Sequence, residues 1–139
     1  MAFTLLSGCM DGRQGNYYQS YIDPLTAGNV IALEEGEQPK LIFSQNIEAD
    51  KEKYQNLGFV IIGQSEFDTT DEKRYLRRNV DSHAQRAIEQ AKKVHATHIL
   101  YLREKVSENM ETTIKDGKYE TERFERFKNV SVYLVRGTN

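Results

Sequence analysis

The dipeptide Asp116–Gly117 constrains the fold most strongly, because it predicts where the chain reverses direction. Both central residues of a type I′ turn need a positive φ, which glycine adopts freely and aspartate tolerates. The flanking segments 111–115 and 118–123 are polar and are expected to pair as a largely exposed β-ribbon. The segment 127–136 is expected to return into the domain as an alternating strand. One face would carry Val130, Val132 and Leu134, and the other Ser131, Tyr133 and Val135.

Two helices are predicted upstream of the ribbon. The first spans about 48–57 and is closed by Gly58 in a left-handed conformation. The second spans about 83–95, because Ser82 and Gln85 have the spacing of a capping box. Its solvent side is expected to include Gln90, and its narrow apolar stripe consists of Ala84, Ala87, Ile88, Ala91 and Val94.

Three further segments are predicted to be strands or buried extended chain. Residues 41–43 suit a strand or a packed arm, and residues 97–102 have high β-propensity. The continuous apolar run 59–63 indicates a central strand. Segments 58–64 and 96–103 are expected to run parallel, with 130–135 antiparallel beside the second. The predicted fold class is therefore α+β: a small mixed sheet, formed by a β-α-β unit and a β-hairpin, with the main helix 83–95 packed on one face.

Domain organisation follows from where the periodicity begins. A chain of 139 residues supports one modest core. Residues 10–40 are polar, hold both prolines and lack sustained periodicity, so they are predicted to be a flexible tether. Residues 41–139 are predicted to form a single α+β periplasmic domain, in which 68–81 is a charged loop or a loop with one helical turn. The basic run 73–78 within it is interpreted as a solvated surface rather than a phosphate-binding patch.

Composition excludes several classes of function. The formal net charge of -2 argues against binding nucleic acid through its phosphates. The single cysteine, Cys9, allows no internal disulfide, and no run of about 18 apolar residues follows it.

The N-terminus resembles a bacterial lipoprotein processing site. Leu6, Ser7 and Gly8 precede Cys9 as the aliphatic and small residues of a lipobox. We therefore expect diacylglycerol and an N-acyl chain on Cys9, with residues 1–9 as a truncated signal. Only eight residues precede Cys9 and none is basic, so Met1 is expected to be a start codon placed too far downstream or the boundary of a shortened chain.

Two runs resemble a family of small, largely uncharacterised exported proteins and lipoproteins of Gammaproteobacteria. The first is Tyr54-x-x-x-Gly58-Phe59-Val60-x-Ile62-Gly63-x-Ser65-x-Phe67, and the second is Ala87-x-x-x-Ala91-Lys92-x-Val94-x-Ala96-x-x-Ile99-Leu100. The resemblance covers about residues 50–103 and the closing strand around Val132–Val135. It implies an exported protein with a signal peptide or lipobox. His95 departs from the family, which usually has glycine there, and a non-glycine residue can close the helix at modest cost.

No catalytic constellation is evident, so we expect a protein that is not an enzyme. His83, His95 and His98 lack the spacing of a zinc site, and no metal or catalytic residue is predicted. The serines lack the context of a nucleophile elbow. The three carboxylates Glu104, Glu108 and Glu111 are interpreted as the solvated face of the hairpin.

These observations predict an outer-membrane lipoprotein on the periplasmic face, because Met10 after the cysteine is not an inner-membrane retention signal. It would act as a structural or accessory component of a cell-envelope protein assembly, for example a secretion complex. The candidate partner contacts are Tyr17, Tyr18, Tyr21, Asp116 and Gly117. One alternative is a small soluble cytosolic adaptor in which Cys9 has no role. Another is an envelope ligand-binding domain or hydrolase whose site is assembled from dispersed residues.

Overall fold

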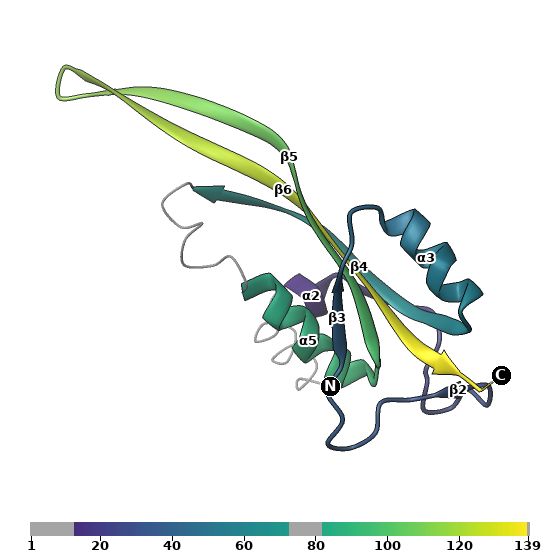
Figure 1. The fold of residues 1–139 in the computed structure, drawn as a ribbon. Helices are drawn as coiled ribbons and strands as arrows, with labels where there is room; N and C mark the ends of the chain where they lie inside the picture. Colours follow the sequence, from purple (N-terminus) through teal and green to yellow (C-terminus); the bar gives the residue numbers. More distant parts are fainter. Residues whose placement is uncertain (1–12, 73–81, 139) are drawn as a thin grey trace.

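The structure, a computed structural model, describes residues 13–72 and 82–138. Within these residues the chain forms three helices and one mixed sheet of six strands (Figure 1), which confirms the predicted α+β class. The elements are α2 (Arg13–Asn16), β1 (Tyr18–Ser20), β2 (Val30–Ile31), β3 (Lys40–Phe43), α3 (Ile47–Asn56), β4 (Phe59–Glu72), α5 (Ser82–Val94), β5 (His98–Lys115) and β6 (Lys118–Gly137).

Strand β6 is the centre of the sheet. The strand order is β1-β4-β6-β5-β3, and β2 pairs with the end of β6. Because β4 and β5 both pair antiparallel with β6, they run parallel to each other, as predicted, with β6 between them. Among the described strands, the hydrogen-bonded parallel pair is β3 with β5, from Lys40 opposite His98 to Phe43 opposite Tyr101.

The predicted alternation along β6 is confirmed and divides the core in two. Tyr133 and Val135 belong to a cluster with the alanines of α5, whereas Val130, Val132 and Leu134 pack with Ile47 of α3. A strand buried on both faces must carry apolar residues at successive positions, which explains its composition.

Both predicted helices are present. The side-chain oxygen of Asn46 accepts a hydrogen bond from the Ala49 amide at 3.1 Å and caps α3, which is followed by Gly58 at φ 99°. After α5, His95 adopts φ 63°, so it takes the left-handed position at the cost expected of a non-glycine residue. The prediction for Gln90 was wrong, because its side chain is buried rather than on the solvent side of α5.

Residues 13–40 differ from the predicted tether. They contribute α2, β1 and β2, and Gln14 is fully buried. The Gln14 carbonyl oxygen accepts a hydrogen bond from the Ser65 hydroxyl at 2.7 Å, and the ring of Tyr18 lies edge-on to that of Tyr133. Single residues of this segment fill gaps in a sheet built by other strands, and such contacts leave no periodic pattern in the sequence.

Strand β4 is longer than predicted. It continues through residues 68–72, which the charge pattern suggested were part of a loop. Pairing with β6 explains the difference: the Arg126 guanidinium lies 3.2 Å from the Asp68 carboxylate, while Thr69 points inward and is 3% exposed. The predicted loop residues 73–81, including the basic run 73–78, lie outside the described residues.

Candidate interaction surface

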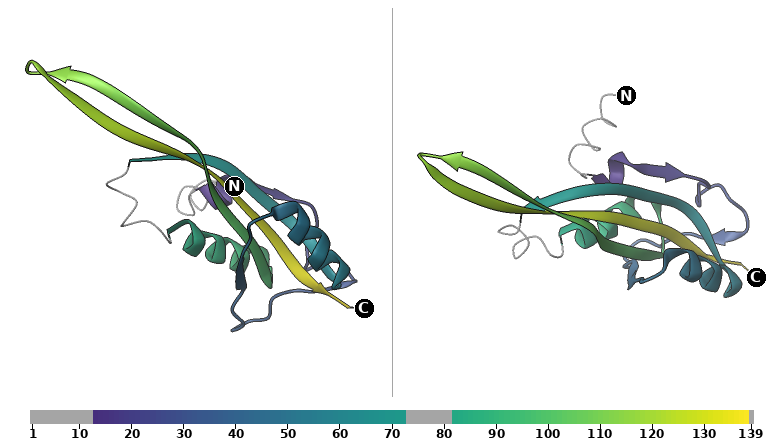
Figure 2. Two further views of the ribbon diagram at one scale, coloured as in Figure 1. Left: turned by 45° about the horizontal axis from the view of Figure 1, so that its top comes forward. Right: turned by 90° about the horizontal axis from the view of Figure 1, so that it is seen from above.

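The most prominent feature of the molecule is a ribbon that projects from the domain (Figures 1 and 2). We define the ribbon as residues 106–123, where β5 and β6 pair with each other and with no further described strand. Every residue from 108 to 122 is exposed. Asp116 at φ 53° and Gly117 at φ 76° form the turn, which confirms the predicted hairpin.

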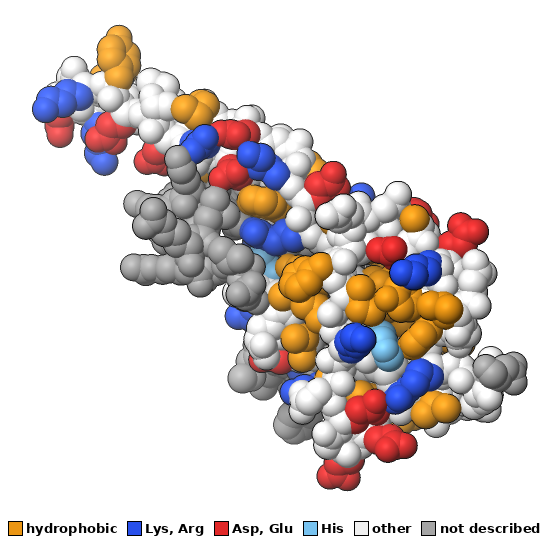
Figure 3. All heavy atoms as spheres, viewed as in Figure 1, with side chains coloured by type: hydrophobic (Ala, Val, Ile, Leu, Met, Phe, Trp, Pro, Cys, Tyr) orange, Lys and Arg blue, Asp and Glu red, His pale blue; other side chains and the backbone are white. Residues whose placement is uncertain are grey.

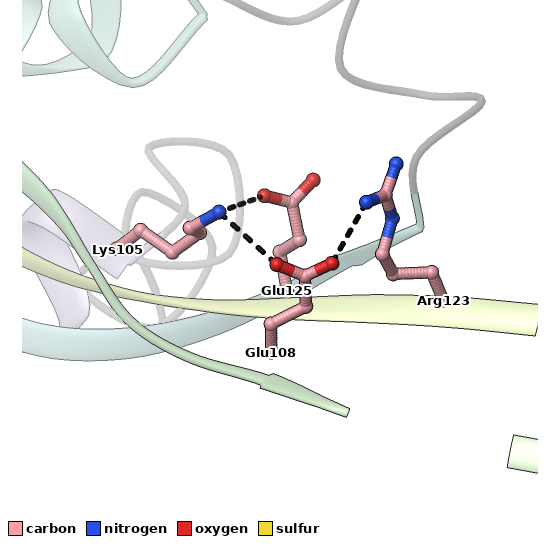
Figure 4. A network of polar contacts seen from close by, with 4 residues as sticks. All are labelled: Lys105, Glu108, Arg123 and Glu125. Carbon is pink, nitrogen blue, oxygen red and sulfur yellow. Dashed lines mark hydrogen bonds and ion pairs between the residues drawn. The ribbon is translucent and has the colours of Figure 1, made fainter. Parts of the chain in front are cut away.

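A polar network holds the base of the ribbon (Figure 4). The Lys105 ammonium lies 3.2 Å from the Glu125 carboxylate and 3.3 Å from that of Glu108. The Arg123 guanidinium donates to the other oxygen of Glu108 at 2.8 Å. These bonds raise the pKa of Lys105, mainly through Glu125, and lower the pKa of Glu108, mainly through Arg123. The network lies next to a β-bulge at Val106, between Lys105 and Ser107.

One face of the ribbon carries three exposed apolar side chains. Ile114 lies opposite Tyr119, and Met110 is four residues before Ile114 on the same strand, so all three share a face. Thr112 lies between Met110 and Ile114 on this face, opposite Thr121. The hydroxyls of the two threonines are 3.0 Å apart, which agrees with this alignment. Met110, Ile114 and Tyr119 are 64%, 71% and 79% exposed. We call these three residues the apolar tip.

The opposite face of the ribbon is charged: it carries three glutamates along its length and the pair Lys115 and Lys118, which face each other beside the turn. Glu111 lies directly opposite Glu122, and Glu120 lies opposite Thr113 in the same register. Like charges that face each other across two strands are destabilising unless solvent or a partner separates them. The two faces of the ribbon therefore differ, because one exposes the apolar tip and the other exposes polar and charged side chains.

A second surface feature lies at the end of the molecule away from the ribbon. It is a hollow of about 560 Å³ beside the segment that joins β2 to β3. The residues that line it are Leu25, Leu33, Glu34, Glu35, Gly36, Glu37, Gln38, Lys92 and His95. We call it the acidic hollow. Figure 3 shows acidic side chains gathered at this lower end of the molecule.

Hydrogen bonds fix one wall of the acidic hollow. The Glu37 carboxylate accepts from the backbone amide of Glu34 at 3.1 Å and from the Arg136 guanidinium at 2.7 Å. The bond from the Glu34 amide, followed by that from Arg136, lowers the pKa of Glu37. Gly36 at φ 85° allows the tight turn that brings these residues together.

The three tyrosines predicted to contact a partner have different environments. Tyr17 and Tyr21 are 56% and 54% exposed, and the ring of Tyr17 stacks on that of Phe67. Tyr18 is half-buried against the core, and this burial raises its pKa to about 12. Of the other predicted site residues, the lipobox Leu6–Gly8 and Cys9 lie outside the described residues.

The histidines occupy different environments. His83 lies in α5 near the ring of Phe67, and His95 follows α5. His98 on β5 lies edge-on to Phe59, with ring centroids 4.6 Å apart. Burial lowers the pKa of His98, and the positive charges of Arg136 and Lys40 lower it further. In the described ranges, no cluster of three His, Cys, Asp or Glu side chains is arranged to hold a metal ion.

The carboxylates near the hairpin are divided by the bulge. Register places Glu104 and Glu111 on the same face of the β5–β6 pair, whereas Glu108 joins the network on the other face. Glu104 also lines a smaller, open hollow of about 240 Å³ beside the start of α3, together with Glu66 and Lys128. These positions bring no two of the three carboxylates together with a histidine.

Sequence reasoning missed both the apolar tip and the acidic hollow. The apolar tip could have been predicted from the sequence, because a two-residue turn at Asp116–Gly117 places Ile114 opposite Tyr119. The hollow was not, because Leu25 and Leu33 come close to Lys92 only in the folded chain.

The described residues contain no helix long and apolar enough to cross a lipid bilayer. Comparisons with protein-family models, with curated proteins and with solved structures found no match.

Proposed function

We propose that this protein is a lipid-anchored, non-catalytic component of a bacterial cell-envelope assembly, and that the ribbon is the arm by which it contacts a partner protein. The observation that carries the proposal is the apolar tip, in which Met110, Ile114 and Tyr119 share one exposed face of the ribbon. The lipobox at Leu6–Cys9 supports the anchor and the location.

The energetics of the ribbon support a contact role. Residues 108–122 are exposed throughout, so their side chains add little to the hydrophobic core. Their backbone is nevertheless fixed in cross-strand pairs, which costs conformational entropy that the core does not offset. Complete burial of an exposed isoleucine yields about 1.5–3 kcal/mol, and aromatic residues such as tyrosine are favoured in protein interfaces. The outer edge of β5 beyond Tyr101 has no described neighbour, so a partner strand could also pair there.

The lipid anchor would retain the protein at a membrane. Each buried methylene contributes about 0.8 kcal/mol, and one acyl chain alone binds only marginally. Three chains on a processed Cys9 would therefore hold it firmly, and Met10 favours sorting to the outer membrane, with the domain on the periplasmic face.

Metabolic labelling with a palmitate analogue tests the anchor. Cells expressing the native gene should yield a labelled protein in the outer-membrane fraction, and Cys9→Ser should remove the label. A Ser7→Ala variant is the matched control, because alanine is also small enough for the lipobox. Unlabelled wild-type protein in the cytosol would instead support the soluble adaptor.

Site-specific photo-crosslinking tests the arm. A photoreactive residue at Ile114 should form a defined crosslinked species in cells, whereas the same residue at Thr113 on the opposite face should not. Both positions are exposed and adjacent, so the pair controls for reach and expression. Equal crosslinking patterns at the two positions would contradict a role for the apolar tip.

A further inference from the structure

We propose that the ribbon of one molecule docks into the acidic hollow of a second copy, so that copies join head to tail. This inference rests on the proposed role of the ribbon as an arm and names its partner. The contact would place Ile114 and Tyr119 against Leu25 and Leu33.

The end of the ribbon combines apolar and basic groups. Ile114 and Tyr119 lie on one face, and their sequence neighbours Lys115 and Lys118 face each other on the opposite face, one on either side of the turn. Asp116 in the turn offsets one of these two positive charges. Figure 3 shows basic, acidic and apolar side chains at this end of the molecule. A complementary surface must therefore offer apolar groups to one face of the ribbon's end and acidic groups to the other.

The acidic hollow has this composition. Its apolar lining includes Leu25, which is 63% exposed and so leaves a hydrophobic surface uncovered. Its rim carries Glu34 and Glu35, against Lys92 as the one lysine that lines it, whereas the third glutamate, Glu37, is ion-paired with Arg136. The charge of the rim is thus opposite to that of the ribbon's end, which favours attraction and fixes orientation.

The size of the hollow also fits. Its volume of about 560 Å³ falls within the range of about 300–1,000 Å³ that is usual for binding pockets. A hairpin end inserted there would cover only a small area, well under the roughly 1,200 Å² of a stable interface. The association is therefore expected to be weak, with a dissociation constant on the order of 100 micromolar.

The occupant must come from another molecule. The ribbon and the segment between β2 and β3 lie at opposite ends of the molecule in both figures that show the fold (Figures 1 and 2). The two paired strands run without a break from the sheet to the turn, apart from the bulge at Val106, so the ribbon cannot fold back to its own hollow. A contact between two different surfaces of identical copies is heterologous and continues into a chain or a ring.

Two variants of the full chain, each also carrying Cys9→Ser to avoid lipid, test this geometry. The first removes the apolar contact through Ile114→Ser and Tyr119→Ser. The second reverses the charge of the rim through Glu34→Lys and Glu35→Lys. All four positions are exposed, and circular dichroism would verify that both variants fold like the Cys9→Ser parent.

Sedimentation velocity from about 10 to 500 micromolar gives the readout. The parent should increase in mass with concentration, and each variant alone should stay monomeric. Their mixture should form pairs and nothing larger, because only the intact ribbon of the second variant can enter the intact hollow of the first. Glu52→Lys on α3 is the matched control for charge reversal and should associate like the parent.

A charge swap adds a second test. Lys115→Glu with Lys118→Glu should abolish association, and adding Glu34→Lys and Glu35→Lys to the same chain should restore it. A parent that stays monomeric at every concentration would overturn head-to-tail docking, as would association that none of these variants alters. Crosslinking of Ile114 to a different envelope protein in cells would then leave the proposed function standing.

Discussion

The hydroxyl of Tyr133 donates a hydrogen bond of 3.1 Å to the side-chain oxygen of Gln14, although the two residues are 119 positions apart in the sequence. Both residues are fully buried, and burial raises the pKa of Tyr133. The bond joins the first described helix to the central strand of the sheet. Helix α2 is thus part of the packed domain.

Gln14→Ala is expected to destabilise the protein by about 1–3 kcal/mol, because it leaves the buried Tyr133 hydroxyl without its acceptor. The free energy of unfolding in urea, followed by circular dichroism, measures the loss. Gln19→Ala on β1 is the control, since Gln19 is exposed and should change stability by less than about 0.5 kcal/mol. Equal effects at the two positions would show that Gln14 is not packed as described.

Gly63→Ala is expected to cost about 1–3 kcal/mol through overpacking, because a Cβ at this position would overlap the ring of Tyr18. In a Tyr18→Ala background the same substitution should be much less harmful, which a double-mutant cycle would detect as coupling. Gly28→Ala is the matched control, since a Cβ there meets nothing within 4 Å. Additive effects of Gly63→Ala and Tyr18→Ala would contradict the packing of β1 on β4.

Stability is expected to fall in mild acid because of His98. Its pKa is lowered in the folded protein from the ordinary value of 6.5, so the unfolded chain binds the proton more readily. The stabilisation is fully present above pH 6.5 and is lost as the pH falls through the folded pKa.

Urea unfolding at pH 7.5 and at pH 5 would measure this loss, and His98→Gln should reduce the difference between the two values. Titration of His98 by NMR gives its pKa directly. A pKa above 6.5 would reverse the sign of this effect and contradict the described environment beside Phe59 and Arg136.

Gly117→Val is expected to loosen the ribbon without unfolding the domain. A β-branched residue is strained at φ 76°, whereas the ribbon contributes no side chain to either core cluster. Hydrogen exchange of amides in residues 108–122 should accelerate, while exchange in β4 and α5 stays unchanged. Thr113→Val in the same ribbon is the control and should retain slow exchange, because β-branched residues suit a strand.

Local signals explain which elements the sequence predicted well. The alanine stripe of α5, the cap at Gly58 and the turn at Asp116–Gly117 each depend on residues within a few positions of one another. Such patterns are visible without knowledge of the fold. The alternation along β6 is also local, because successive side chains of a strand point to opposite faces.

Tertiary structure alone decided how these elements combine. Strand β6 lies between β4 and β5, and β4 extends past Phe67, because its backbone stays paired with β6 and Asp68 forms an ion pair with Arg126. Gln14 and Tyr18 are buried because they fill spaces left by distant strands. The acidic hollow likewise forms only where Leu25 and Leu33 come close to Lys92. The sequence by itself determined the helices and the hairpin, because their signals are local. Contacts between residues far apart in the chain leave no periodic pattern in the sequence. Only the tertiary structure therefore decided which surfaces these elements expose.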